Sequence, residues 1–599
     1  MKLFKNKFST KTSINLRETT RPAIISEMSK TILFVSLMLF LRTAQKHHTE
    51  SLPPARNLPD APFARNEGKK RKKLPRRCSI HRNSAFKEQS IIKRNRELMK
   101  KNITTSLLLT AALLAGCTTE DFFLSDGENY ASKMSFDKME NPQEGDQFAE
   151  FTDNPFVKTA EESTSTFSVD ADGASYAIMR RYLKKNWNIT PPMVRIEEYL
   201  NYFTFDYAAP TGSHTAAINA EVGPCPWEPA HKLLRLGIKG KEMAQSEMPN
   251  ANYVFLIDVS GSMDSSDKLE LLKSGMIELV DNLNADDRIS IVTYSGEVKK
   301  LLESTPVRQA DKIKKAIKKL NAWGCTNGGE AIHMAYAEAM ANFIPDGNNR
   351  IIMGTDGDFN VGVTSTDSLV RLVEGYASKG IYLTVCGFGS GSLNDNMMEK
   401  ISNSGNGTYE FIDSEDEMMR VFVKNRSRFV AVASDAKCQV TFDSTLVDSY
   451  RLLGYENRVM SNEDFEDDSK DAGEIGAGQT ITALYEIIPT AHLTEADGNQ
   501  TIATFDFRYK KNLAGESIPL QRKVLAGEVE DEETVSENLR FASGVAAYGM
   551  VLRKSPYKGE STFEMAEKLV EQSLTFDPDG YREQLAGLIR MAEKSQTKE

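Results

Sequence analysis

The chain has 599 residues, of which 40% are apolar, and its mean hydropathy of −0.41 is ordinary for a globular protein. This length is too great for one hydrophobic core and predicts roughly three or four domains. The net charge of −10 is unevenly spread: residues 1–98 hold 23 Lys and Arg against 7 Asp and Glu, a balance of +16, so the remainder carries −26. Because nucleic-acid binding needs a basic surface, the acidic remainder argues against a nucleic-acid partner. The basic run at 69–77 could be a nucleic-acid tail, but we favour the interpretation that it is absent from the mature protein.

Residues 99–117 have the order of a signal peptide. They begin with Met-Lys-Lys-Asn, continue through the apolar run Leu107–Ala115 and end in Leu-Ala-Gly-Cys, which resembles a bacterial lipobox. The apolar run is too short to span a bilayer. We expect a lipid anchor at Cys117 in the cell envelope, with the outer membrane favoured over the inner, whereas the alternative is a buried helix with a chance cysteine. Residues 1–98 are then a non-native, disordered upstream extension.

Four cysteines follow the lipobox, and their sparse spacing fits neither a disulfide framework nor a zinc site. Cys386 lies in an apolar run and is expected to be a small buried side chain. A bridge between Cys225 and Cys438 remains open, since an envelope compartment can be oxidising.

A polar, acidic stretch at 118–163 is expected to be a flexible tether. Residues 164–249 form an N-terminal segment with a short strand at 166–170, helices near 173–185 and 193–203, and strands within 214–240. For Asp172 we favour the N-cap of the first helix over a second metal site shared with Asp170.

Strand and helix patterns alternate between 250 and 428, which predicts an α/β fold with a doubly wound, mostly parallel sheet. The expected strands are 252–257, 287–294, 297–302, 349–355, 381–387 and 408–412. The expected helices are 267–283, 310–321, 328–343, 366–379, 394–403 and 414–427.

Residues 429–530 return to strand patterns, and residues 531–599 are helical. Neither 214–240 nor 429–530 makes a convincing closed sheet pair alone. We therefore expect them to combine into one β-sandwich-like domain, with the α/β domain inserted in a loop and helical segments flanking it. The acidic segment Glu463–Glu474 is interpreted as a solvated loop, with a calcium loop as the alternative.

Five oxygen-bearing side chains are expected at one edge of the parallel sheet. Asp258, Ser260 and Ser262 follow an apolar strand, Thr326 lies in a small-residue loop before a helix, and Asp356 ends another strand. Ligands of such sheets bind at the carboxyl ends of the strands, and oxygen-only donors suit Mg²⁺. The alternative is that these residues only cap helices and tighten turns.

Asp-x-Ser-x-Ser, a loop threonine and a strand-end Thr-Asp-Gly together resemble the metal-ion-dependent adhesion site of von Willebrand factor A (VWA) domains. The resemblance implies that Ser260, Ser262 and Thr326 bind Mg²⁺, or Mn²⁺ or Ca²⁺, directly, and that Asp258 and Asp356 act largely through water. It also implies a protein ligand whose Asp or Glu carboxylate completes the coordination of the cation.

The flanking sequences are similar to a family of bacterial envelope VWA proteins with an N-terminal VWA-associated segment and a C-terminal domain of unknown function. The motifs that carry this similarity are Ser165–Asp170, Ala174–Tyr176, Arg195–Phe203, Arg451–Arg458 and Asp471–Gly478.

The function expected from the sequence is a lipid-anchored binding protein. The alternative is an assembly or chaperone-like partner of a MoxR-type AAA+ ATPase, which would be a separate chain because no phosphate-binding Gly-x-x-x-x-Gly-Lys-Ser/Thr loop occurs. We do not expect an enzyme: the chain has only seven histidines, and Ser260 has no sequence-evident base. The sequence carries no signal for an oligomeric state.

Overall fold

The structure is a computed structural model that describes residues 145–596, apart from 325–327 and 358–365. The predicted lipidation residue Cys117 and the predicted ligand Thr326 lie outside the described residues, as does the predicted signal peptide. None of the described helices combines the length and the apolar character that crossing a membrane requires.

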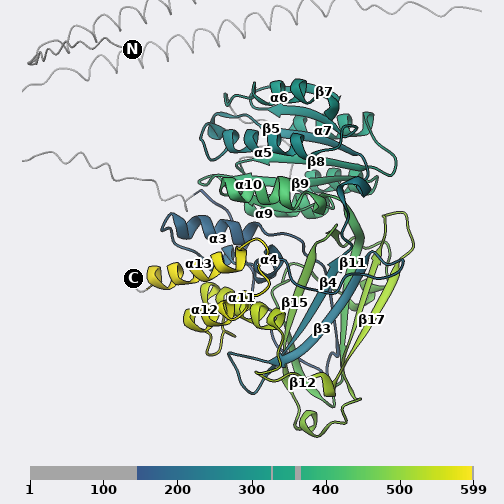
Figure 1. Ribbon diagram of the computed structural model, residues 1–599, viewed down its shortest axis with the longest axis vertical. Coiled ribbons are helices and arrows are strands. Elements are labelled where there is room, and N and C mark those ends of the chain that lie inside the picture. Colours follow the sequence, from purple (N-terminus) through teal and green to yellow (C-terminus); the bar gives the residue numbers. More distant parts are fainter. Residues whose placement is uncertain (1–144, 325–327, 358–365, 597–599) are drawn as a thin grey trace, which may run out of the picture. The chain divides into compact units, whose positions relative to one another are not determined.

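The middle of the chain forms the predicted α/β domain around a six-stranded sheet of order β10-β9-β8-β5-β6-β7 (Figure 1). Five strands are parallel, and β7 at the edge pairs antiparallel with β6. The strands are β5 (Ala251–Asp258), β6 (Arg288–Tyr294), β7 (Val298–Pro306), β8 (Asn348–Thr355), β9 (Ile381–Phe388) and β10 (Tyr409–Ile412).

Helices cover both faces of this sheet. Alternate residues of β5 enter two different cores: Val254 and Leu256 pack with α7, α8 and α9, whereas Phe255 and Ile257 pack with α5, α6 and α10. A strand buried on both faces therefore needs the continuous apolar run that the sequence shows. The helices are α5 (Leu269–Asn282), α6 (Ala310–Ile317), α7 (Gly329–Ala341), α8 (Thr366–Ala377), α9 (Asp395–Ser404) and α10 (Glu415–Met419).

The expected helix at 414–427 is only partly α-helical. After α10 the chain forms a π-helical turn at Arg420–Lys424 and a 3₁₀ turn at Arg426–Phe429. Val421 and Phe422 remain buried through this change, so the apolar pattern alone does not distinguish the wider turn from an α-helix.

Two further sheets pack face to face as the predicted β sandwich. Their orders are β1-β12-β15-β4-β3 and β13-β2-β11-β16-β17, and β14 pairs with β11. Leu234 and Ile481 of one sheet share a core with Val440 and Phe505 of the other. The strands are β1 (Val157–Lys158), β2 (Thr164–Ser168), β3 (Ala216–Pro224), β4 (Lys232–Gly240), β11 (Ala431–Phe442), β12 (Val447–Leu453), β13 (Val459–Met460), β14 (Gly473–Gly476), β15 (Thr480–Pro489), β16 (Thr501–Lys510) and β17 (Ile518–Leu525).

Pairing between distant strands confirms the predicted insertion. β4 pairs antiparallel with β15, with Leu236 opposite Ala483, although the whole α/β domain separates these strands in sequence. The N-terminal segment adds β2, which pairs with β11. The sandwich is therefore built from segments on both sides of the inserted domain.

Helices from both ends of the described chain share a fourth core. It contains Tyr199 of α4, Val545 of α11, Val570 of α12 and Leu585 of α13, and Figure 1 shows these helices beside α3. The helices are α3 (Ala174–Lys184), α4 (Ile196–Tyr202), α11 (Glu537–Arg553), α12 (Phe563–Glu571) and α13 (Tyr581–Gln596).

The three cysteines that the structure describes are buried and lie in different cores. Cys225 belongs to the helical core, Cys438 to the sandwich core and Cys386 to a core of the α/β domain, and all three are free thiols. The Cys225–Cys438 bridge that the sequence left open is therefore wrong, and the buried position expected of Cys386 is confirmed.

The tether predicted for residues 118–163 extends too far, because its last part belongs to the folded structure. Residues 145–163 contact the folded part of the chain: Val157 and Lys158 pair with β12, and Asn154 donates hydrogen bonds to the carbonyls of Leu452 and Gly454. Polar composition predicted a solvated segment, but these backbone groups find partners at the edge of a sheet.

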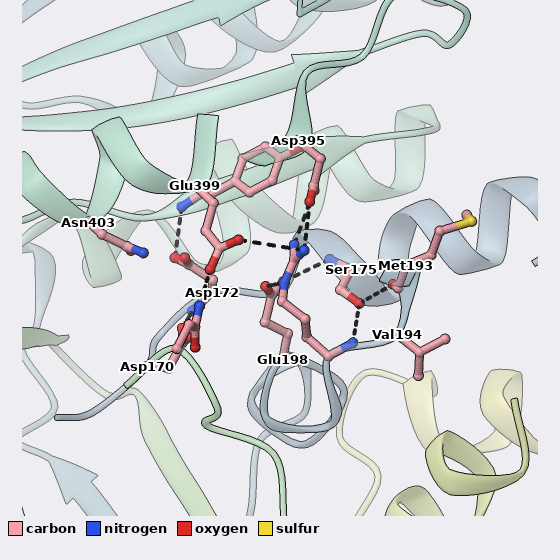
Figure 2. A network of polar contacts seen from close by, with 12 residues as sticks. Asp170, Asp172, Ser175, Met193, Val194, Glu198, Asp395, Glu399 and Asn403 are labelled. Atoms are coloured by element: carbon pink, nitrogen blue, oxygen red, sulfur yellow. Dashed lines mark hydrogen bonds and ion pairs between the residues drawn. The ribbon is translucent and has the colours of Figure 1, made fainter. Parts of the chain in front are cut away.

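A buried ionic network joins the N-terminal segment to the α/β domain (Figure 2). The Arg195 guanidinium lies 2.6 Å and 3.1 Å from the two carboxylate oxygens of Asp395 at the start of α9. It also contacts Glu198 and, at 3.6 Å, Glu399. All four side chains are nearly inaccessible, so one guanidinium faces three carboxyl groups away from water, and burial raises the pKa of Glu198 and of Glu399 above their usual values.

Asp172 is not the N-cap that the sequence predicted. The cap of α3 is Gly173, and the Oδ1 atom of Asp172 instead accepts the backbone N–H of Tyr409 at 2.8 Å. Arg458 lies 3.0 Å from Asp170 and 3.6 Å from Asp172. Burial raises the pKa of Asp172 well above its usual value, because it opposes ionisation more strongly than the nearby Arg458 favours it.

Candidate metal centre

The loop after β5 carries the first three predicted ligands on alternate residues. Asp258 is the last residue of the strand, and its Oδ1 atom accepts the backbone N–H of Ser260 at 2.8 Å. The hydroxyl oxygens of Ser260 and Ser262 lie 2.9 Å apart. Asp258 and Ser260 are buried, whereas Ser262 is exposed at the rim.

Asp356 reaches the same edge from the neighbouring strand. β5 and β8 are parallel, with Ile257 opposite Gly354, so their carboxyl ends meet. Asp356 follows β8 and is fully buried, and the hydroxyl of Thr355 donates to Asp258 Oδ2 at 3.5 Å. Four of the five predicted ligands therefore lie at one edge of the sheet, and the fifth, Thr326, is outside the described residues.

Burial sets the ionisation of Asp258. Desolvation raises its pKa to about 6, the hydrogen bonds from Ser260 oppose this rise, and the negative charge of Asp356 adds to it. The carboxylate is still the main form of Asp258 at pH 7. Two carboxylates held close together in a buried site favour a nearby cation.

Lys268 is the cation that the structure places at this site. Its Nζ atom lies 2.9 Å from Asp356 Oδ2 and 2.9 Å from the backbone carbonyl of Ser262. Sequence reasoning missed this residue, because a lysine at the start of an amphipathic helix normally points to solvent. The ammonium balances the buried charge of Asp356 and occupies space beside the predicted ligands.

Replacing Lys268 with methionine is expected to tighten Mg²⁺ binding about tenfold. A cation entering the site must replace the Lys268 contact with Asp356, and a charged hydrogen bond contributes about 1.5–3 kcal/mol. Titration calorimetry compares this variant with Lys273→Met, which removes a lysine of the same helix that pairs with Glu270. Equal Mg²⁺ affinity in Lys268→Met and the wild type would show that the ammonium does not compete with the metal.

The last part of the predicted tether supports the loop next to Asp356. Asp146 Oδ1 accepts the backbone N–H groups of Gly391 at 2.6 Å and Leu393 at 2.9 Å, and the hydroxyl of Tyr182 donates to its other oxygen. Ser392 in the same loop donates to the carbonyl of Asp356 at 3.4 Å. The segment predicted as a tether therefore helps to position the candidate site.

The donor set fits a hard divalent cation. In the described part of the chain, no group of three or more His, Cys, Asp or Glu side chains is placed to share a metal ion. The candidate centre has only two carboxylates, so its remaining donors must be hydroxyl oxygens, which Mg²⁺, Mn²⁺ and Ca²⁺ accept. Softer metals, which favour thiolate and imidazole, do not match it.

Comparisons with known families agree with this architecture. Residues 252–424 match the von Willebrand factor type A domain, residues 142–235 match a family described as von Willebrand factor, and residues 427–595 match the C-terminal domain of the uncharacterized protein YfbK.

Relatives match over different lengths. YfbK of Escherichia coli is 35% identical over 489 residues, which cover 77% of this chain and 84% of YfbK. The uncharacterized protein sll0103 of Synechocystis is 30% identical over 32% of this chain and 45% of its own length. Human inter-alpha-trypsin inhibitor heavy chain H3 is 28% identical over 26% of this chain and 18% of its own length.

Solved structures are more distant. A von Willebrand factor type A protein from Catenulispora acidiphila is 16% identical, with a TM-score of 0.37 over 62% of this chain and 88% of that one. The protein BatB from Bacteroides thetaiotaomicron is 22% identical, with a TM-score of 0.26 over 30% of this chain and 98% of that one.

Proposed function

Since this chain belongs to the family of YfbK, with a VWA domain and the YfbK C-terminal domain, we propose that it binds a protein ligand through a divalent cation. The cation is Mg²⁺, or Mn²⁺ or Ca²⁺, at Asp258, Ser260, Ser262, Thr326 and Asp356. The convergence of Asp258, Ser260 and Asp356 at one sheet edge supports this proposal.

The charge balance of the site favours an acidic ligand. The seryl hydroxyls are neutral donors, so a cation that they bind directly keeps most of its positive charge. A carboxylate oxygen from outside then adds a favourable interaction in a site that is partly shielded from water. The partner is therefore a protein that presents an Asp or a Glu.

The surroundings of Ser260 support binding rather than catalysis. Its hydroxyl lies 2.9 Å from that of Ser262 and also hydrogen-bonds the Asp258 carboxyl, which the proposed function assigns to the cation. His333 lies on α7, and its side chain is exposed. The proposal also includes the lipid anchor at Cys117 in the cell envelope, which rests on the lipobox of the sequence.

A pull-down from an envelope extract of the source bacterium tests this function. The wild-type protein is expected to retain a partner in Mg²⁺, to release it in EDTA and to recover it when Mg²⁺ is restored. The Asp258→Asn variant is expected to retain none, since it lacks one of the two buried charges. Capture that persists in EDTA, or in the variant, would contradict metal-bridged binding.

A further inference from the structure

A groove lies directly beside the candidate metal centre. It has a volume of about 770 Å³, and its lining includes Val259 from the Asp258 loop, Leu301 from β7, and Leu320 and Trp323 from the segment after α6. β7 and α6 lie at the same end of the sheet (Figure 1). The groove therefore extends from the loop that carries the predicted ligands, which contributes Val259, toward the edge strand β7.

Backbone hydrogen bonds join the lining of the groove to the loop that carries Asp258, Ser260 and Ser262. The N–H of Trp323 donates to the carbonyl of Val259 at 2.7 Å, and the N–H of Gly261 donates to the carbonyl of Gly324 at 2.9 Å. Val259 and Gly261 alternate with the predicted ligands Asp258, Ser260 and Ser262. Trp323 therefore lies beside the loop that carries the predicted ligands.

Trp323 is exposed to an unusual degree. Its relative accessibility is 79%, the largest among the exposed large apolar side chains of the described residues, and Leu301 in the same groove is 36% exposed. Apolar side chains that gather in one groove, as Trp323 does with Val259, Leu301 and Leu320, mark interaction sites more than singly exposed ones do. Tryptophan is also the residue type most enriched among those that dominate binding energy at interfaces.

The charges around the groove complement an acidic segment. Lys299 and Lys319 line it together with one acidic residue, Glu297, which pairs with Lys299 at 2.7 Å. Lys319 is exposed and forms no ion pair with any residue that the structure describes. The groove thus presents apolar side chains and a lysine next to a site that favours a carboxylate.

We propose that this groove is the specificity surface of the protein. It binds a large apolar side chain, such as Leu or Phe, that lies within a few residues of the Asp or Glu whose carboxylate meets the cation. This inference rests on the proposed function and adds the chemistry of the partner: an acidic segment with an adjacent large apolar residue. Trp323 provides the main contact.

Fluorescence anisotropy with labelled synthetic peptides tests the groove. One set carries a central Asp with Leu or Phe one, two or three residues away, and matched sets replace the apolar residue by Gly or the Asp by Asn. The proteins are the wild type, Trp323→Ala and the control Val459→Ala, which removes an exposed apolar side chain of β13 in the sandwich. Titration calorimetry measures Mg²⁺ affinity for each.

The wild type is expected to bind the Asp peptides with Leu or Phe in Mg²⁺ but not in EDTA. Affinity is expected to fall roughly 30-fold when the apolar residue becomes Gly, and by the same factor in Trp323→Ala, which is the size of an interface hot spot. Mg²⁺ affinity is expected to be unchanged in Trp323→Ala, and Val459→Ala is expected to match the wild type.

Two results would separate this inference from the proposed function. The groove inference is overturned if peptides bind in an Mg²⁺-dependent way but Trp323→Ala keeps the same preference for an apolar residue. It is also overturned if the protein binds Mg²⁺ and none of the peptides. If calorimetry detects no Mg²⁺ binding to the wild type, the proposed function itself fails, and the inference fails with it.

Discussion

Replacing Arg195 with methionine is expected to lower the free energy of unfolding by about 3–5 kcal/mol, the usual effect of removing one partner from a buried ion pair. Methionine keeps the apolar volume but leaves Asp395, Glu198 and Glu399 without the guanidinium that they share. Denaturant unfolding followed by circular dichroism measures the change.

A surface ion pair provides the control for this prediction. Arg590→Met removes a guanidinium that bridges Glu567 and Glu571 in an exposed position, where the expected loss of stability is much smaller than that of Arg195→Met. The double variant Arg195→Met/Asp395→Asn is expected to recover part of the stability, because it removes one of the unpaired charges. Equal stabilities of Arg195→Met and Arg590→Met would mean that the network does not hold the N-terminal segment to the α/β domain.

The Asp258→Asn variant is expected to bind Mg²⁺ roughly 10- to 100-fold more weakly than the wild type, the effect typical of losing a residue that supports a metal site. Asparagine keeps the Oδ1 acceptor for the Ser260 N–H, so the loop retains its hydrogen bond while the buried charge is lost. Titration calorimetry gives the affinity, and circular dichroism shows whether the fold is kept.

A remote aspartate provides the control, because its replacement changes the net charge of the protein but not the charge at the candidate site. Asp286→Asn changes an exposed residue that pairs with Arg308 and precedes β6, at the opposite end of the strands from the candidate site. It is expected to bind Mg²⁺ as the wild type does. If Asp258→Asn unfolds instead of losing Mg²⁺ affinity, the residue is structural.

The α/β domain was predictable because its pattern is local. A strand such as β5, buried on both faces, must be apolar throughout, and the helices that cover it show one apolar stripe each. The insertion was predictable for another reason: neither the strands within 214–240 nor those after 429 make a convincing closed sandwich alone. The close approach of Asp258, Ser260 and Asp356 follows from parallel neighbouring strands ending at one edge.

Contacts between side chains that are far apart in the sequence leave no local pattern, so they could not be predicted from it. Asp172 precedes a helix, which predicts a cap, but it bonds to Tyr409 and lies near Arg458, far away in sequence. Lys268 resembles a solvent-facing helix residue, yet its ammonium reaches Asp356. Residues 145–163 are polar, as tethers are, but they pair with a sheet edge and support the loop near the site.

Diffraction from crystals grown with Mn²⁺ tests the central claim most directly, because the anomalous signal locates the metal itself. The account predicts one strong peak between the Asp258 loop and Asp356, about 2–2.3 Å from the hydroxyls of Ser260 and Ser262. Displacement of the Lys268 ammonium from Asp356 is expected in the same crystals. A map without a peak at this sheet edge, with Lys268 still bonded to Asp356 at saturating Mn²⁺, would contradict the account.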